Sequence, residues 1–226
     1  INCDQEDPNL GECVTEALKT FFPTFRVIIH LNFPPLDPYY VAKQKITFKI
    51  LDAVEGFVLF KGVKVYGVSG AIFHKNIVNI TEEGGSVKTS LTVPHIFVEG
   101  KYKAGIKIND FIVTPKGYFN ITMTDATVEA TTAGKFKNIN GAKHIIANKF
   151  DIEDFAADMK IYASSLLPDP EQNNVLLDIT NRYIPEILRV GIPATKNQWA
   201  PAVLQSINDF LKEVPFDNLL SKRIYA

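Results

Sequence analysis

The sequence predicts an α+β protein in which an antiparallel β-sheet is combined with helices near both ends of the chain. Three observations lead to this expectation. Residues 87–136 form a succession of β-branched and aromatic runs separated by turn residues, which is typical of an antiparallel meander. The apolar positions change parity near residue 125, which indicates a curled sheet. Residues 199–214 repeat apolar side chains at helical spacing, so a C-terminal amphipathic helix is expected.

The composition is that of a soluble globular chain. The 226 residues are 46% hydrophobic and 22% charged, with a formal net charge of -1, so one domain (1–226), or two fused halves of one core, is expected. The basic residues are scattered without an excess, so nucleic acid is not an expected partner. No apolar run approaches the roughly 18 to 20 residues that a membrane span needs. Residues 21–33 are apolar but contain Pro23, Arg26 and His30, and predict a buried turn or strand.

The N-terminal part predicts one helix followed by three strands. A helix is expected over residues 10–22, with Asn9 as N-cap, Glu12 completing a capping box and Pro23 as the stop. The proline-rich residues 33–38 cannot continue a regular element. Strands are expected over 41–51, 56–66 and 71–80, with an interruption at residues 61–62, a turn at 67–70 and a Gly-rich loop at 82–86.

The central part predicts a sheet that bends. Short strands are expected at 90–93, 95–98, 104–108, 111–113 and 118–123, separated by Pro94, Gly100, residues 109–110 and residues 115–117. The apolar set Phe119, Ile121 and Met123 is followed by a second set, Ala126, Val128 and Ala130, that is displaced by one position. Both sets reach the same face only if an extra residue lies between them, so a bulge is predicted near residues 124–125. A curled sheet with one apolar face must enclose a helix, a ligand or both.

The C-terminal part predicts a hairpin, a strand and two helical segments. Asn140-Gly141 predicts a hairpin joining 135–139 to 142–147, and 150–162 fits a strand with an irregularity. Asp169 and Pro170 predict a helix start, Pro185 a kink, and residues 191–193 a break before the last helix. In that helix the apolar face is Trp199, Val203, Leu204, Ile207, Phe210, Leu211 and Val214, and the solvent face is Gln205, Asn208, Asp209, Lys212 and Glu213.

No arrangement of reactive residues predicts catalysis. The histidines, at 30, 74, 95 and 144, are dispersed singly, and neither a Gly-x-Ser-x-Gly elbow nor a His-Glu-x-x-His motif occurs. Residues 84–89 lack the glycine and the following helix of a phosphate-binding loop. We therefore expect no enzyme, no catalytic residue, no metal site and no cofactor. Cys3 and Cys13 could be unrelated thiols or a redox couple, although Cys-x-x-Cys spacing is absent.

Five segments together resemble the takeout and haemolymph juvenile-hormone-binding proteins of insects. They are DPNLGECVTEAL (7–18), FPPLDPYYV (33–41), LTVPHIFVEGKYKAG (91–105), GYFNITMTDATVEATTAGKF (117–136) and VPFDNLL (214–220), in that family's order over nearly the whole chain. The resemblance implies a strongly curved antiparallel sheet wrapped around a long C-terminal helix, a tubular lipid-binding-like fold with a short N-terminal helix and an elongated apolar tunnel.

The resemblance also implies a Cys3–Cys13 disulfide and hence secretion. In the loop-entropy model so short a loop contributes roughly 2 to 3 kcal/mol. The sequence opens at Ile1 without a charged and then apolar leader, so we expect a mature chain whose signal peptide has been removed. The sequons at Asn79 and Asn120 are compatible with secretion, and the second lies in a predicted strand.

The implied function is that of a secreted carrier of a small hydrophobic ligand, such as a terpenoid, fatty acid or quinone. The expected tunnel wall is Trp199, Val203, Ile207, Phe210, Phe119, Ile121 and Met123. The alternatives are a secreted protein-interaction or signalling module, with an unidentified protein receptor as partner, and a lipid-processing enzyme. Residues 164–170 stand where takeout-like chains often have a Gly/Asp-containing loop, and the second cysteine pair of juvenile-hormone-binding proteins proper is absent. Takeout-like is therefore the closer description, and no single ligand is implied.

Overall fold

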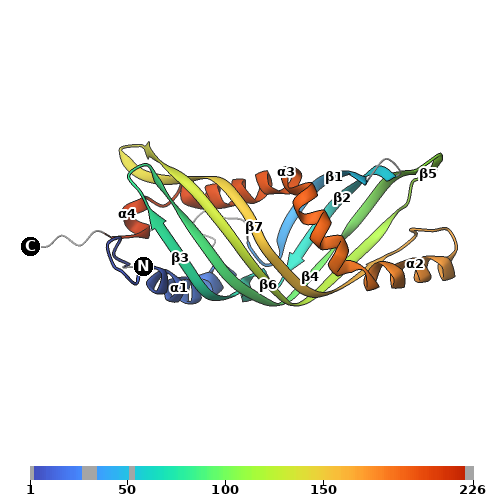
Figure 1. Ribbon diagram of the computed structural model, residues 1–226, viewed down its shortest axis with the longest axis horizontal. Helices are drawn as coiled ribbons and strands as arrows, with labels where there is room; N and C mark the ends of the chain where they lie inside the picture. The colour runs from blue at the N-terminus through green and yellow to red at the C-terminus, as the bar shows by residue number, and fades with distance from the viewer. Residues whose placement is uncertain (1–2, 27–34, 51–53, 222–226) are drawn as a thin grey trace, which may run out of the picture.

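Long antiparallel strands form the body of the molecule in the computed structural model, which describes residues 3–26, 35–50 and 54–221 (Figure 1). The strands are β1 (Tyr39–Ile50), β2 (Val54–Tyr66), β3 (Ile72–Ile80), β4 (Gly84–Ile108), β5 (Phe111–Val113), β6 (Lys116–Ile139) and β7 (Ala142–Ala163). The helices are α1 (Leu10–Phe21), α2 (Pro170–Arg182), α3 (Ile184–Leu211) and α4 (Phe216–Leu219), with 3₁₀ segments η1 (Phe22–Arg26) and η2 (Val68–Gly70). The expectation for residues 21–33 falls mainly on 27–34, which lie outside the described residues.

The seven strands belong to one sheet of order β1-β2-β4-β6-β7. β3 pairs with the first part of β4, on the side where β2 pairs with the rest of that strand. β5 pairs with the last residues of β4, on the side where β6 pairs with it. The sheet curls, and α3 lies along it from the end that carries α4 to past its middle, where α2 takes over (Figure 1). The predicted α+β class, with a curved antiparallel sheet, a long C-terminal helix and a short N-terminal helix, is confirmed.

The expectation that Pro94 and Gly100 separate short strands was wrong, because β4 runs through both residues. On one side of β4 no strand pairs with Pro94, because β2 ends opposite Phe97 and β3 begins opposite Thr92. On the other side Pro94 lies between the Val93 and His95 pairs, where β6 bulges. The absence of an N–H at Pro94 therefore removes few hydrogen bonds between strands. Gly100 gives room to a partner, since a Cβ there would lie 3.0 Å from the Phe119 ring.

The bulge predicted near residues 124–125 is confirmed. The register between β6 and β7 shifts between Thr124 and Thr127, and Asp125 adopts the left-handed conformation with φ 49°. Met123 and Ala126, on either side of the extra residue, contact the same apolar cluster. The hairpin at Asn140-Gly141 and the irregular strand over 150–162 are also confirmed, although that strand is the second half of a longer one, β7.

The first two helices begin where the sequence predicts. Asn9 is the N-cap of α1, but its side chain makes no capping bond, so the predicted capping box does not form; instead Asp7 Oδ1 accepts the Asn9 N–H at 2.7 Å. Asp169 caps α2 by accepting the Gln172 N–H at 2.9 Å, and Pro170 occupies the first turn. The helix is interrupted at Tyr183, two residues before Pro185, which lies in the first turn of α3, where its missing N–H is not needed.

The predicted break at residues 191–193 was wrong, because α3 continues through Pro193 and Pro201 to Leu211. A proline inside a helix removes one backbone hydrogen bond, so Pro193 and Pro201 leave the Arg189 and Asn197 carbonyls without their usual helical partner, and two side chains bond other carbonyls of this segment. Thr195 Oγ1 donates to the Gly191 carbonyl at 2.7 Å, and Trp199 Nε1 donates to the Ile192 carbonyl at 3.2 Å. These bonds and the contacts of α3 with the sheet hold the segment helical.

Candidate functional site

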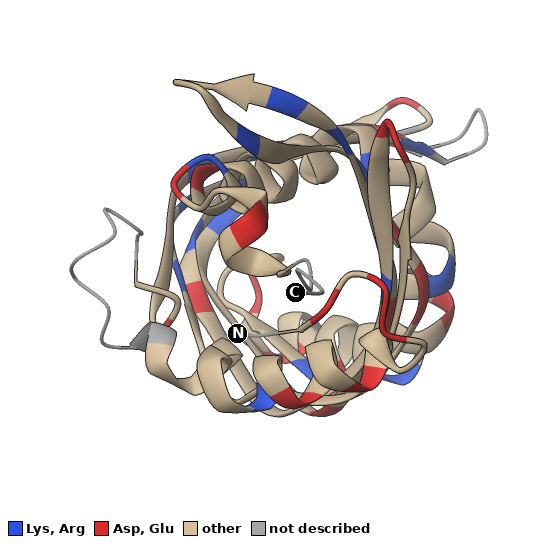
Figure 2. Ribbon diagram, turned by 90° about the vertical axis from the view of Figure 1, so that its left-hand side faces the viewer, with Lys and Arg blue, Asp and Glu red and all other residues tan. Residues whose placement is uncertain are grey.

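The long helix closes the sheet by contacting its two edge strands. α3 packs against β7 at one edge and against β1 at the other. Viewed along the long axis, strands and helices form a ring (Figure 2). An open sheet of this curvature would expose unpaired backbone groups at both edges, and α3 covers them. The inner face of the sheet and the facing side of α3 therefore define the candidate site.

Three amide side chains attach the helices to the sheet edges. Asn208 of α3 accepts the Ala147 N–H and donates to the Ala147 carbonyl, both at 2.8 Å. Gln198 makes the same pair with Thr47 of β1, at 2.6 and 2.8 Å. Asn181 of α2 makes it with Ile161 of β7, at 2.7 and 2.9 Å. Each amide donates one hydrogen bond and accepts one, as a residue of a neighbouring strand would, so each substitutes locally for the strand that the edge lacks. We call these three the amide clasps.

The amide clasps are not evident from the sequence pattern, which predicts Asn208 on the solvent face of the last helix. That placement was wrong, since Asn208 is half-buried against β7. A weak signal was available: asparagine has low helix propensity, so its presence in the middle of a helix suggests another role. Period alone cannot distinguish a polar residue facing solvent from one facing a sheet edge.

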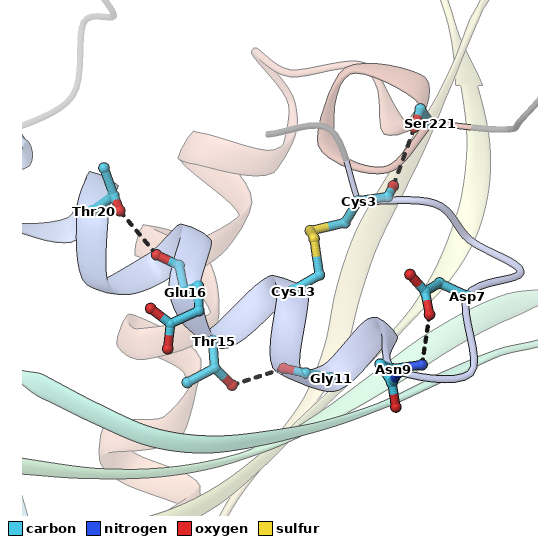
Figure 3. Close-up of a disulfide and its surroundings, with 9 residues drawn as sticks. All are labelled: Cys3, Asp7, Asn9, Gly11, Cys13, Thr15, Glu16, Thr20 and Ser221. Atoms are coloured by element: carbon cyan, nitrogen blue, oxygen red, sulfur yellow. Dashed lines mark hydrogen bonds between the residues drawn. A yellow bond between two sulfur atoms is a disulfide. The ribbon is translucent and has the colours of Figure 1, made fainter.

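One end of the ring is closed by the two ends of the described chain. The predicted disulfide between Cys3 and Cys13 is present, and it ties the N-terminal segment to α1 (Figure 3). Ser221 N donates to the Cys3 carbonyl at 2.8 Å, and Gln5 N donates to the Ser221 carbonyl at 3.0 Å. Cys3, Leu10, Phe216 and Leu220 are buried together there. The opposite end carries α2 and the β4–β5 hairpin (Figure 1).

Helix α1 is seated on β3 by a close backbone approach. A Cβ at Gly11 would lie 2.2 Å from the Asn76 carbonyl oxygen, so only glycine fits. Thr15 Oγ1 donates to the Gly11 carbonyl at 2.7 Å and accepts the Asn76 N–H at 3.0 Å. These buried polar contacts fix the position of α1 at the closed end.

The predicted tunnel-wall residues lie on β6 and on α3. On β6, Phe119 is buried in a cluster with Tyr102 and Leu177, and Ile121 packs against that cluster. Met123 packs against the cluster of Phe73 and Val93. On α3, four residues are only half-buried: Trp199, Val203, Ile207 and Phe210. The Trp199 ring meets Phe150 edge-on, with centroids 6.1 Å apart.

The three buried clusters of the described residues are formed by the sheet with α1, α2 and α4. None of their members or packed neighbours comes from α3. Fully buried apolar positions are often small; six of them are alanines: Ala71, Ala104, Ala126, Ala147, Ala163 and Ala200. The stripe of α3 and the inner face of the sheet are thus both apolar, and no buried cluster of the described part joins them.

Two surface hollows lie away from these residues. A hollow of about 420 Å³ is lined by Lys19, Pro23, Ser69, Gly70, Ala71 and Ile72, next to α1 and η2. A smaller one of about 200 Å³ lies beside the β3–β4 turn and Gly134. Neither is lined by any of the seven predicted wall residues, whose role therefore stays a prediction.

The perturbed titratable groups are dispersed. Hydrogen bonding to Lys88 lowers the pKa of Glu153, and the same bond raises the pKa of Lys88. Burial raises the pKa of Tyr102, whose hydroxyl donates to the Ser164 carbonyl at 2.6 Å. Burial, followed by the bond to Glu99, raises the pKa of Tyr66. In the described ranges no three His, Cys, Asp or Glu residues are grouped to hold a metal.

The fold and the apolar inner faces define the class of protein: a curled antiparallel sheet closed by one long helix. Residues 1–221 match the family described as "Haemolymph juvenile hormone binding protein (JHBP)", and the chain belongs to this family. No described helix has the length and apolar character needed to cross a membrane.

Solved structures share the fold. One similar structure is Takeout 1 of Epiphyas postvittana, with 18% identity, a TM-score of 0.75, and coverage of 97% of this chain and 99% of that one. A lipopolysaccharide binding protein matches with 15% identity and a TM-score of 0.37, covering 96% of this chain and 39% of that one. No curated protein matches the sequence. The takeout and juvenile-hormone-binding resemblance that the five segments predict is confirmed.

Proposed function

We propose that this protein is a secreted carrier that binds one small hydrophobic ligand between the inner face of the sheet and α3. The family to which it belongs is named for binding a hormone in haemolymph, and the Cys3–Cys13 disulfide is compatible with an oxidising compartment. The observation that carries the proposal is the apolar stripe of α3, which stays half-buried outside the packed clusters. A ligand would complete the burial of this stripe.

The accessible surface is larger than that expected of a compact protein of this mass. A compact protein of 25.2 kDa is expected to expose about 10,300 Å². This chain exposes 14385 Å². The elongated shape (Figure 1) contributes to the excess. An empty apolar space is costly, at roughly 24 cal/mol per Å³, so ligand or solvent should fill it.

The proposed wall consists of Trp199, Val203, Ile207 and Phe210 on α3 and of Phe119, Ile121 and Met123 on β6. These side chains are apolar, so dispersion and burial would hold the ligand. Terpenoids, fatty acids and quinones all satisfy these conditions. We propose no catalytic role, because the perturbed titratable groups do not converge.

An exposed apolar stripe favours the second candidate, a protein-interaction module. Val175, Ile179, Tyr183, Ile187 and Val190 follow one another at helical spacing along α2 and α3, and each is about half exposed or more. A stripe of this kind on the outer surface is where a protein receptor would dock. A carrier and a docking module differ in whether the inner or the outer face of α3 controls binding.

Fluorescence of Trp199, the only tryptophan, tests the proposal. A quinone or polyene ligand should quench its emission saturably, and Ile207→Ala or Phe210→Ala should change the affinity several-fold by altering the wall. The matched control is Ile187→Ala on the outer face of α3, where 49% of the side chain is exposed. It should leave the affinity unchanged. Tight ligand binding whose affinity is unchanged in both Ile207→Ala and Phe210→Ala would show that the ligand binds elsewhere.

A further inference from the structure

The outer face of the sheet carries lysines that oppose one another across strands. Lys43 of β1 pairs with Lys61 of β2, and Lys61 pairs with Lys101 of β4. Two residues further along β4, Lys103 pairs with Lys116 of β6. Lys45 of β1 lies two residues from Lys43. We call these six exposed residues (43, 45, 61, 101, 103 and 116) the lysine face. Strands lie about 4.8 Å apart, so the six charges are close neighbours.

Like charges placed directly opposite each other destabilise a sheet. Within the described ranges none of the six lysines forms an ion pair, and the adjacent Glu55 pairs instead with Lys107 at 3.7 Å. Two of the six rest on aromatic rings, Lys45 on Phe57 and Lys101 on Tyr118. The face therefore combines uncompensated positive charge with aromatic surface, although the whole chain has a net charge of -1.

An exposed apolar tip adjoins the lysine face. The hairpin that joins β4 to β5 presents Phe111, 78% exposed, and Ile112, 71% exposed. Lys107 precedes the tip and Lys116 follows it, while Asp110 is the acidic residue in the turn. The hairpin lies at the end of the molecule away from the disulfide (Figure 1). Large apolar side chains flanked by cations are the pattern of an interfacial membrane anchor.

We propose that the lysine face and the Phe111–Ile112 tip dock the protein on an anionic lipid bilayer. The lysines lie against acidic headgroups, and the tip enters the boundary between headgroups and acyl chains. A purely polyanionic partner, such as a sulfated polysaccharide, would use the lysines but leave the apolar tip without a role. Docking in this orientation brings the end opposite the disulfide-closed one to the membrane, where an apolar molecule could be exchanged.

Vesicle co-sedimentation tests the docking, and it requires no knowledge of the bound ligand. The full chain should bind phosphatidylcholine vesicles that contain phosphatidylserine, bind far less to phosphatidylcholine alone, and lose binding as salt is raised. Each lysine near an anionic surface contributes about fivefold in affinity, so the triple variant Lys61→Gln, Lys101→Gln, Lys103→Gln should bind about a hundredfold more weakly. Phe111→Ser with Ile112→Ser should weaken the binding that persists at high salt.

The matched control replaces three exposed lysines elsewhere, Lys75, Lys137 and Lys212, by glutamine and changes the net charge equally. It should keep most of the vesicle binding. Equal losses in both triple variants would mean that overall charge decides, and would overturn the proposal. So would failure of the native protein to bind anionic vesicles, or heparin binding that depends on the same lysines without any vesicle binding. Ligand binding is measured separately by Trp199 quenching. A loss of vesicle binding with normal quenching would therefore refute the docking but not the carrier function, and a loss of quenching with normal vesicle binding would refute the carrier function but not the docking.

Discussion

Removing the Asn208 clasp should destabilise the protein much more than its place on a helix surface suggests. Asn208→Ala deletes two hydrogen bonds of 2.8 Å and leaves the Ala147 N–H and carbonyl unpaired, at a residue that is only 5% exposed. A typical hydrogen bond contributes about 1 kcal/mol net, and an unsatisfied buried group costs about 1 to 3 kcal/mol. We therefore expect a loss of about 2 to 3 kcal/mol, or roughly 5 to 10 °C in Tm for a domain of this size.

The Gln198 clasp offers an internal comparison. Its bonds to Thr47 lie at an exposed position, so water can replace them, and Gln198→Ala should cost less than about 1 kcal/mol. Asn197→Ala is the control, because Asn197 lies on the same helix, is exposed and makes no side-chain hydrogen bond within the described part of the chain. Urea unfolding of the three variants gives the ranking. Asn208→Ala falling within a few tenths of a kcal/mol of the control would refute the clasp as a source of stability.

Three further predictions concern the closed end, the helix and a buried hydroxyl. Gly11→Ala should destabilise by driving a Cβ to 2.2 Å from a backbone oxygen of β3, whereas Gly191→Ala, with open space around its Cβ, should stabilise α3 by up to about 1 kcal/mol in thermal unfolding. Replacing Cys3 and Cys13 together by serine should cost roughly 2 to 3 kcal/mol in urea unfolding. Tyr102→Phe should cost about 1 kcal/mol, because the Ser164 carbonyl loses its donor.

The Tyr102 variant also has a pH signature. Burial raises the pKa of its hydroxyl in the folded state, so the folded protein retains this proton more strongly than the unfolded chain. The associated stability is fully present below the unfolded pKa of about 10 and is lost as the pH rises through the folded pKa. Tyr102→Phe should therefore flatten the alkaline fall in stability, and Tyr40→Phe, at an exposed ring, should not. Identical alkaline profiles for the two variants would contradict this assignment.

Sequence patterns predicted the features that depend on neighbouring residues. The parity change between Met123 and Ala126 located the bulge, since the period of a strand permits no other way to keep both on one face. Turn chemistry located the Asn140-Gly141 hairpin, and the capping preference of aspartate located the start of α2. Each of these signals is local, so tertiary structure had little opportunity to override it.

The predictions failed where contacts with residues distant in the sequence determine the local structure. Pro94 is accepted within β4 because β2 and β3 leave a gap beside it, which no local pattern reveals. Pro193 is accepted within α3 because the helix packs against the sheet along its length. The lysines are scattered along the sequence and gather only through strand register, so composition gave no sign of the lysine face. The amide clasps were missed for the same reason.

Native mass spectrometry of the purified protein tests the carrier function most directly. We predict a mass increment equal to one small apolar molecule, which organic extraction removes and which terpenoids, fatty acids or quinones restore with a stoichiometry of one. Ile207→Ala should weaken this uptake, while Ile187→Ala should not. A protein that carries no increment after native purification, and that takes up none of these compounds, would contradict the proposal that its apolar interior is a binding site.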